Sequence, residues 1–140
     1  MRLYLARHGE ALAADDTQPP LSPRGREDVE ALGVALAAAG TRVAEILHSS
    51  KLRAEQTAEI LSHALGAPRF EAEALRPDDD PTIVAEALAD EHRDLMLVGH
   101  LPHLALLATY LLRGAAHASI EFRTAGLVRL DRHAGRWQLT

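Results

Sequence analysis

The chain has 140 residues, of which 47% are hydrophobic and 25% are charged, a balance that is typical of a globular domain and excludes a disordered chain. It contains no cysteine, which excludes disulfides, thiolate metal sites and a cysteine nucleophile. The formal net charge is −5 and no basic block occurs, so we expect neither nucleic acid nor an anionic membrane as a partner.

In the first half of the chain, predicted strands lead through short polar corners into predicted helices. The strands carry alternating apolar and β-favouring side chains, and the helices carry apolar side chains at helical spacing. In chain order we predict a strand that begins with the alternating residues 2–6 and continues to His8, a helix over 23–39 that begins after Ser22, a strand over 43–47, a helix over 52–65 and a short strand over 69–71.

The second half repeats this pattern and then changes to strands alone. Residues 95–98 are a continuous apolar run, which is typical of a strand that is buried on both faces. In chain order we predict a charged turn over 76–81, a helix over 82–89, the strand over 95–98 ending at Gly99-His100, a helix from Pro102 to Leu112, and strands over 119–122, 127–130 and 137–139, the last two joined as a hairpin.

Strands that alternate with helices predict an α/β fold. We expect a three-layer α/β/α sandwich around a mainly parallel sheet, with an antiparallel element near the C-terminus and a single domain over 1–140. Ligands bind such sheets beyond the carboxyl ends of the strands. The three polar corners, at Arg7-His8, at Ser49-Ser50 with Arg53, and at Gly99-His100, should therefore meet at one edge.

Two imidazoles and two guanidiniums at one edge suit a tetrahedral dianion. Phosphoryl transfer needs an in-line nucleophile and positive donors for the equatorial oxygens. Neighbouring cations also keep an imidazole neutral near pH 7, as a nucleophile requires. Arg53 supports the same interpretation, because a cation in the first turn of a helix opposes the helix dipole unless an anion binds there. Lys51 is expected to extend into solvent.

Three sequence blocks resemble the signature of the histidine phosphatase superfamily, which has the phosphoglycerate-mutase-like fold. The blocks are Leu5-Ala6-Arg7-His8-Gly9-Glu10, Ser49-x-x-x-Arg53-Ala54-x-x-Thr57-Ala58 and Gly99-His100-x-Pro102. Their order and spacing match the family. The short length and the segments 52–57 and 100–102 most resemble the SixA-type phosphohistidine phosphatases, and the similarity runs from Met1 to Thr140.

The resemblance implies a single histidine phosphatase domain over 1–140, acting as a metal-independent hydrolase without a cofactor. It implies that His8 attacks phosphorus and is transiently phosphorylated, while Arg7, Arg53 and His100 clamp the phosphoryl oxygens until water hydrolyses phospho-His8. Ser49 is predicted either to contact phosphate or to cap the following helix. Ser50 stands where many relatives have proline, which affects the expected shape of this loop.

Larger relatives use an acidic residue beyond the second block to protonate the leaving oxygen. The acidic residues in that region are Glu71, Glu73, Asp78, Asp79 and Asp80. None of them lies in a motif that assigns it this role, so the general acid stays open. A phosphohistidine substrate needs such an acid least, since imidazole, with a pKa of about 6.5, leaves easily once it is protonated.

The expected function is removal of phosphate from histidine on a protein, for instance a histidine phosphotransfer domain, in the cytoplasm. Two alternatives remain: a low-specificity phosphomonoester phosphatase and a non-catalytic phosphohistidine-binding module. His103 follows His100 by three residues, and two histidines at this spacing on one helical face are the strongest candidates for metal ligands in the sequence. We do not expect one, because that turn has no carboxylate and a metal mechanism would leave Arg7 and Arg53 unexplained.

Overall fold

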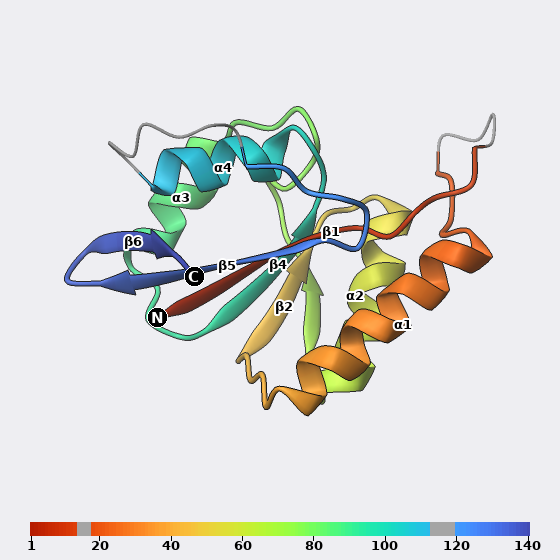
Figure 1. Ribbon diagram of the computed structural model, residues 1–140. Helices are drawn as coiled ribbons and strands as arrows, with labels where there is room; N and C mark the ends of the chain where they lie inside the picture. Colours follow the sequence, from red (N-terminus) through yellow and green to blue (C-terminus); the bar gives the residue numbers. More distant parts are fainter. Residues whose placement is uncertain (14–17, 113–119) are drawn as a thin grey trace.

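The computed structural model describes residues 1–13, 18–112 and 120–140, and it shows a central sheet between two pairs of helices (Figure 1). In chain order the elements are β1 (Arg2–Arg7), α1 (Pro23–Ala38), β2 (Glu45–His48), α2 (Leu52–Leu65), β3 (Arg69–Glu71), α3 (Pro81–Ala89), β4 (Leu95–Gly99), α4 (His103–Leu111), β5 (Leu127–His133) and β6 (Arg136–Leu139). The predicted three-layer α/β/α sandwich is confirmed.

The six strands lie in the order β3-β2-β4-β1-β5-β6. The first four are parallel, whereas β5 runs antiparallel to β1 and β6 runs antiparallel to β5. This confirms a mainly parallel sheet with an antiparallel C-terminal element. It also makes β1 and β4 direct neighbours, with Arg7 opposite Gly99, so that two of the three corners lie side by side.

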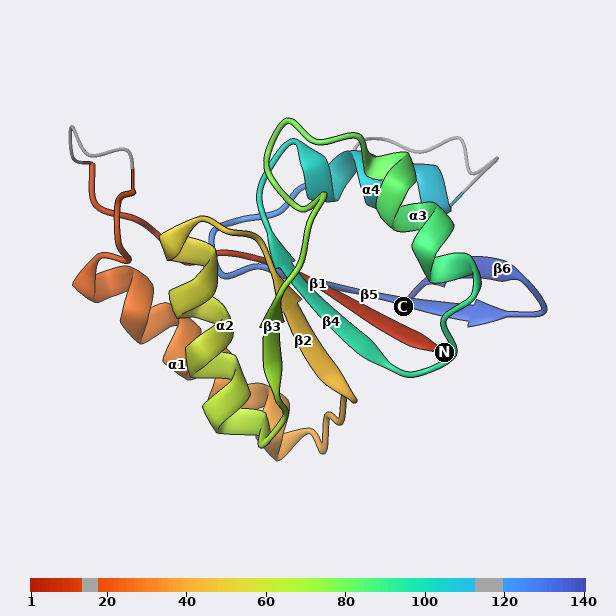
Figure 2. The ribbon, with the colours of Figure 1, turned by 180° about the vertical axis from the view of Figure 1, so that it is seen from behind.

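The two faces of the sheet are covered by different helix pairs, α1 with α2 on one face and α3 with α4 on the other (Figures 1 and 2). Side chains in a strand point alternately to the two faces. Leu3 and Leu5 accordingly belong to the buried cluster that includes α3 and α4, whereas Tyr4 and Ala6 pack with α1 and α2. All five residues of β4 are buried, as its apolar sequence predicts.

Capping residues fix the start of α1, the start of α3 and the end of α2. The Ser22 hydroxyl accepts a hydrogen bond from the Gly25 N–H at the start of α1. Asp80 caps α3 by accepting from the Thr82 N–H, and α2 ends at Gly66, whose φ of 65° is left-handed. Within the described ranges, no helix combines the length and the apolar character that crossing a bilayer requires.

Three predictions for the second half of the chain need correction. Pro102 precedes α4 as its N-cap residue rather than opening the helix, and α4 ends at Leu111. The hairpin turn is shorter than predicted: β5 extends to His133, because Ala134 and Gly135 both take positive φ and form the two-residue turn that a hairpin favours.

The strand predicted over 119–122 is the third correction. Residue 119 lies outside the described residues, and residues 120–122 are irregular rather than extended in the sheet. The prediction was wrong because the apolar side chains that suggested a strand serve another purpose. Phe122 is only 5% exposed and belongs to the core cluster beneath α3 and α4.

Candidate active site

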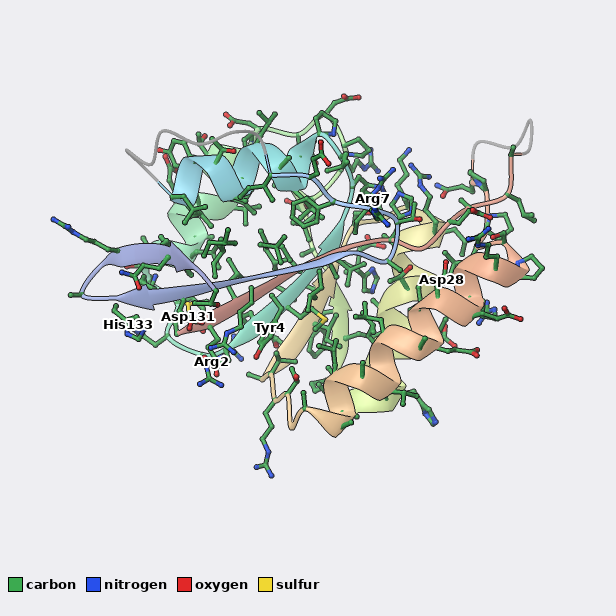
Figure 3. The ribbon with its side chains drawn as sticks, viewed as in Figure 1. Arg2, Tyr4, Arg7, Asp28, Asp131 and His133 are labelled. Carbon is green, nitrogen blue, oxygen red and sulfur yellow. The ribbon has the colours of Figure 1, made fainter. Side chains whose placement is uncertain are left out.

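The register of β1 and β4 brings the first and third corners together at the carboxyl ends of the strands. The His8 N–H donates to the Gly99 carbonyl at 3.0 Å, so each strand delivers a histidine to the same place. The ring centroids of His8 and His100 are 4.9 Å apart, with the planes inclined by 51°. Figure 3 shows Arg7 at the end of β1 that is remote from Arg2, which marks this edge.

The His8 ring is held in one orientation by the backbone. Its Nδ1 lies 2.7 Å from the Gly9 carbonyl oxygen, and a carbonyl only accepts hydrogen bonds. Nδ1 therefore carries the proton of the neutral ring, which leaves a lone pair on Nε2. The side chain is largely shielded, with 8% of His8 exposed.

His8 and His100 are both neutral at pH 7. Burial is the main cause for His8 and lowers its pKa to about 4, with the Arg53 and Arg7 charges acting in the same direction and the Gly9 carbonyl opposing them. Burial also lowers the pKa of His100 to about 3, with further contributions from His8, Arg53 and Lys51. The site therefore presents two uncharged imidazoles among cationic side chains.

Ser49 contacts His100. Its hydroxyl shares a 2.6 Å hydrogen bond with His100 Nε2 and accepts a 3.3 Å hydrogen bond from the Lys51 N–H. The N-cap residue of α2 is Lys51, so the capping role considered for Ser49 is not observed. Lys51 is partly buried rather than extended into solvent, and its charge lowers the pKa of His100.

Two arginines supply the positive charge beside His8. Arg7 donates from Nη1 to the Phe122 carbonyl at 3.0 Å, which fixes the guanidinium against the irregular segment before β5. Arg53 projects from the first turn of α2, where burial lowers its pKa. Both charges act on His8, and Arg53 also acts on His100. The structure therefore brings together all five residues predicted from the three corners.

Thr57 joins the first corner to the second, a role that our sequence interpretation missed. Its hydroxyl accepts a 3.0 Å hydrogen bond from the Gly9 N–H and donates to the Arg53 carbonyl at 2.8 Å. The loop after His8 and the helical turn that carries Arg53 are thereby fixed to each other. Thr57 belongs to the second sequence block, but spacing alone did not show that its partner is Gly9.

The segment that leads from His8 into α1 is closely packed. Glu10 Oε1 accepts a 2.9 Å hydrogen bond from the Ser22 hydroxyl, and the Ser22 N–H donates to the Glu10 carbonyl. A side chain at Gly25 would place its Cβ 2.1 Å from that carbonyl oxygen, so only glycine fits. Ser22 and Gly25 therefore hold the loop that follows His8 against the start of α1.

The candidate acids lie in or near the segment that connects β3 with α3. Glu71, Glu73 and Asp78 are exposed. Asp79 Oδ2 accepts a 2.9 Å hydrogen bond from the Arg76 N–H, and Asp80 Oδ1 accepts from the N–H and the hydroxyl of Thr82. The Thr82 N–H and hydroxyl lower the pKa of Asp80, so this carboxylate is an acceptor that caps a helix and is unsuited to donating a proton.

His103 is fully buried in the first turn of α4. Neither ring nitrogen makes a hydrogen bond of regular geometry within the described residues. Burial lowers the pKa of His103, and the Asp79 charge and the nearby Ala74 backbone oppose this shift. Within the same part of the chain, no three histidine or acidic side chains lie close enough together to hold a metal ion.

Acid pH should destabilise the protein through His8 and His100. Above pH 6.5 the two imidazoles are unprotonated in both the folded and the unfolded chain. Below pH 6.5 they become protonated in the unfolded chain, whereas in the folded protein His8 stays neutral down to about pH 4 and His100 down to about pH 3. We expect the free energy of unfolding to fall by up to about 1.4 kcal/mol per pH unit for each ring in this window. Urea unfolding at several pH values measures the slope, and His8→Gln should make it shallower; an equal slope in both proteins would contradict the assignment.

Comparison with known proteins identifies relatives of the whole chain. The model of the histidine phosphatase superfamily (branch 1) matches residues 3–77. Phosphohistidine phosphatase SixA of Escherichia coli K12 is 28% identical over 100% of this chain and 94% of its own length, and an uncharacterized protein of Picosynechococcus is 32% identical over 99% and 89%. The structure of SixA complexed with tungstate superposes with a TM-score of 0.89 at 26% identity, covering 100% of this chain and 94% of that one.

Proposed function

This chain belongs to branch 1 of the histidine phosphatase superfamily and is a SixA-like phosphatase, and on that premise we propose that it removes phosphate from phosphohistidine on a protein by way of phospho-His8. The observation that carries the proposal is the fixed His8 ring, whose proton is held on Nδ1 by the Gly9 carbonyl. Nε2 is thereby kept as the free nucleophile at the carboxyl end of β1.

In the first step His8 Nε2 attacks phosphorus in line with the bond to the substrate imidazole. The N–P bond to His8 forms as the substrate P–N bond breaks, and the leaving imidazole keeps the electron pair and takes a proton from solvent water. The phosphoryl group lies beside His8 during the attack. Arg7 and Arg53, whose charges act on the His8 ring, are near enough to hold its equatorial oxygens. A bound dianion also favours the protonated form of His100, which then donates to the same oxygens.

In the second step water attacks phosphorus, the His8 N–P bond breaks, and inorganic phosphate leaves with His8 regenerated. The clamps that held the oxygens in the first step serve again, because the same charge develops on them. SixA is named as a phosphohistidine phosphatase and matches the whole of this chain, which supports the same substrate class. The engagement of Asp79 and Asp80 in loop and helix contacts supports it too, since imidazole needs little help in leaving.

Turnover of a phosphohistidine protein, a phosphoserine protein and a small phosphate ester under identical conditions tests the proposal. We expect the value of kcat/KM to be highest for the phosphohistidine protein. Comparable values for all three would indicate a low-specificity phosphomonoesterase instead. Tight binding of the phosphohistidine protein without phosphate release would indicate a binding module.

A further inference from the structure

Arg76 lies in the segment between β3 and α3 and contacts the second corner of the site. Its Nε donates to the Ser50 hydroxyl at 2.8 Å. Ser50 directly follows Ser49, whose hydroxyl is hydrogen-bonded to His100. The Arg76 guanidinium and the His100 imidazole are therefore held by adjacent residues, whose Cα atoms are about 3.8 Å apart across a trans peptide.

The backbone around Arg76 is fixed as well. The Arg76 N–H donates to Asp79 Oδ2 at 2.9 Å, and the Asp79 N–H returns a 3.2 Å hydrogen bond to the Arg76 carbonyl. The preceding Leu75 is 1% exposed and belongs to the core cluster beneath α3 and α4. Arg76 is thus an exposed cation on an anchored turn, and little ordering entropy is lost when an anion binds to it.

The Arg76 guanidinium forms no salt bridge with a carboxylate of the described residues, although the Arg76 backbone N–H binds Asp79. Other arginines form salt bridges: Arg69 with Glu59 at 3.7 Å, Arg93 with Glu91 at 2.9 Å, and Arg129 with Asp131 at 2.8 Å. In contrast, the Arg76 Nη groups have no partner among residues 1–13, 18–112 and 120–140. Lys51, the only lysine of a chain with net charge −5, follows the same two serines in the sequence, and its backbone N–H donates to the Ser49 hydroxyl.

We infer that Arg76 forms a second anion subsite that binds a carboxylate near the phosphorylated histidine of the protein substrate. This inference rests on the proposed function, and it implies that the surface of the protein substrate around the phosphohistidine is acidic. An arginine presents two Nη groups to a carboxylate in a fixed plane, and its Nε is already oriented by Ser50. The subsite lies outside the phosphoryl clamps of Arg7 and Arg53, so the two anions of the substrate are bound by separate residues.

Two phosphohistidine peptides of equal length test the subsite, one with glutamate beside the phosphohistidine and one with glutamine in the same positions. The wild-type protein should give a lower KM for the acidic peptide, and added salt should reduce the difference because the subsite is exposed. Arg76→Gln should raise KM for the acidic peptide by up to about fivefold, the upper end for one exposed charge pair, and bring the two KM values together. The effect should fall in KM rather than kcat, because the carboxylate lies away from phosphorus.

Two further variants test whether the oriented Arg76 guanidinium causes the preference for the acidic peptide. Ser50→Ala removes the hydroxyl that orients Arg76 and should reduce the preference for the acidic peptide while the charge remains. Arg136→Gln, on β6 at the opposite end of the sheet, removes an equal charge and should leave the preference unchanged (Figure 1). Equal KM values for the two peptides in the wild type would overturn the subsite alone, whereas failure to release phosphate from either peptide would overturn the proposed function with it.

Discussion

Replacement of His8 by alanine is expected to lower phosphate release roughly ten-thousandfold or more, by analogy with the loss of a catalytic nucleophile in other enzymes. The physical reason is that Nε2 of His8 is the one atom that forms a bond to phosphorus in the proposed mechanism. Binding and the remaining positive charges cannot replace that bond. The rate of phosphate release at saturating phosphohistidine substrate measures the loss.

The backbone contacts of His8 do not depend on its side chain, so the variant should still fold. The His8 N–H bonds to the Gly99 carbonyl, and the His8 carbonyl accepts from the Ala125 N–H. Thermal unfolding of His8→Ala and His8→Gln controls for stability. A folded variant that retains activity within about tenfold of the wild type would rule out His8 as the nucleophile.

Arg53→Ala is expected to slow the reaction by a factor of about a hundred to a thousand, the usual cost of losing one donor to the transition state. Arg53 is the cation that acts on both His8 and His100, so its removal leaves the developing charge on the phosphoryl oxygens with a single guanidinium. Arg53→Lys keeps the charge but loses the fork of donors, and we expect an intermediate rate. Steady-state values of kcat and kcat/KM measure both effects.

The matched control for Arg53 is Arg42→Ala, which removes an exposed arginine at the amino end of β2. This variant should retain wild-type kinetics, since its charge lies at the other end of the strand from the site. Equal activity of Arg53→Ala and the wild type would exclude Arg53 from the phosphoryl site. An equal loss in both variants would point to a general effect of charge instead.

The residues of the candidate site could be proposed from the sequence because the signals that mark them are local. A strand that breaks at glycine and a helix that begins within a few residues specify a polar corner, and three such corners carried His8, Arg53 and His100. The general rule for parallel sheets then placed them at one edge. Their contact depended on one further fact, the direct pairing of β1 with β4, which no local pattern specifies.

The contacts that the sequence did not predict join residues far apart in the chain. The Thr57 hydroxyl binds the Gly9 N–H across 48 residues, and Arg76 binds Ser50 across 26. Either pairing depends on how a loop lies over its neighbours, whereas periodicity reports only which face a residue occupies. The segment 120–122 shows the same limit, since apolar residues suggested a strand where the structure uses Phe122 to fill the core.

The most direct test of the phospho-His8 mechanism is to trap the phosphoryl group during a single turnover. A phosphohistidine protein with radiolabelled phosphate is mixed with excess enzyme, quenched over time, and the labelled residue is located by mass spectrometry. We predict a transient, acid-labile phosphoryl group on His8 that decays as phosphate appears and is absent in His8→Ala. Turnover without any label on the enzyme, or with the label on another residue, would contradict the proposed mechanism.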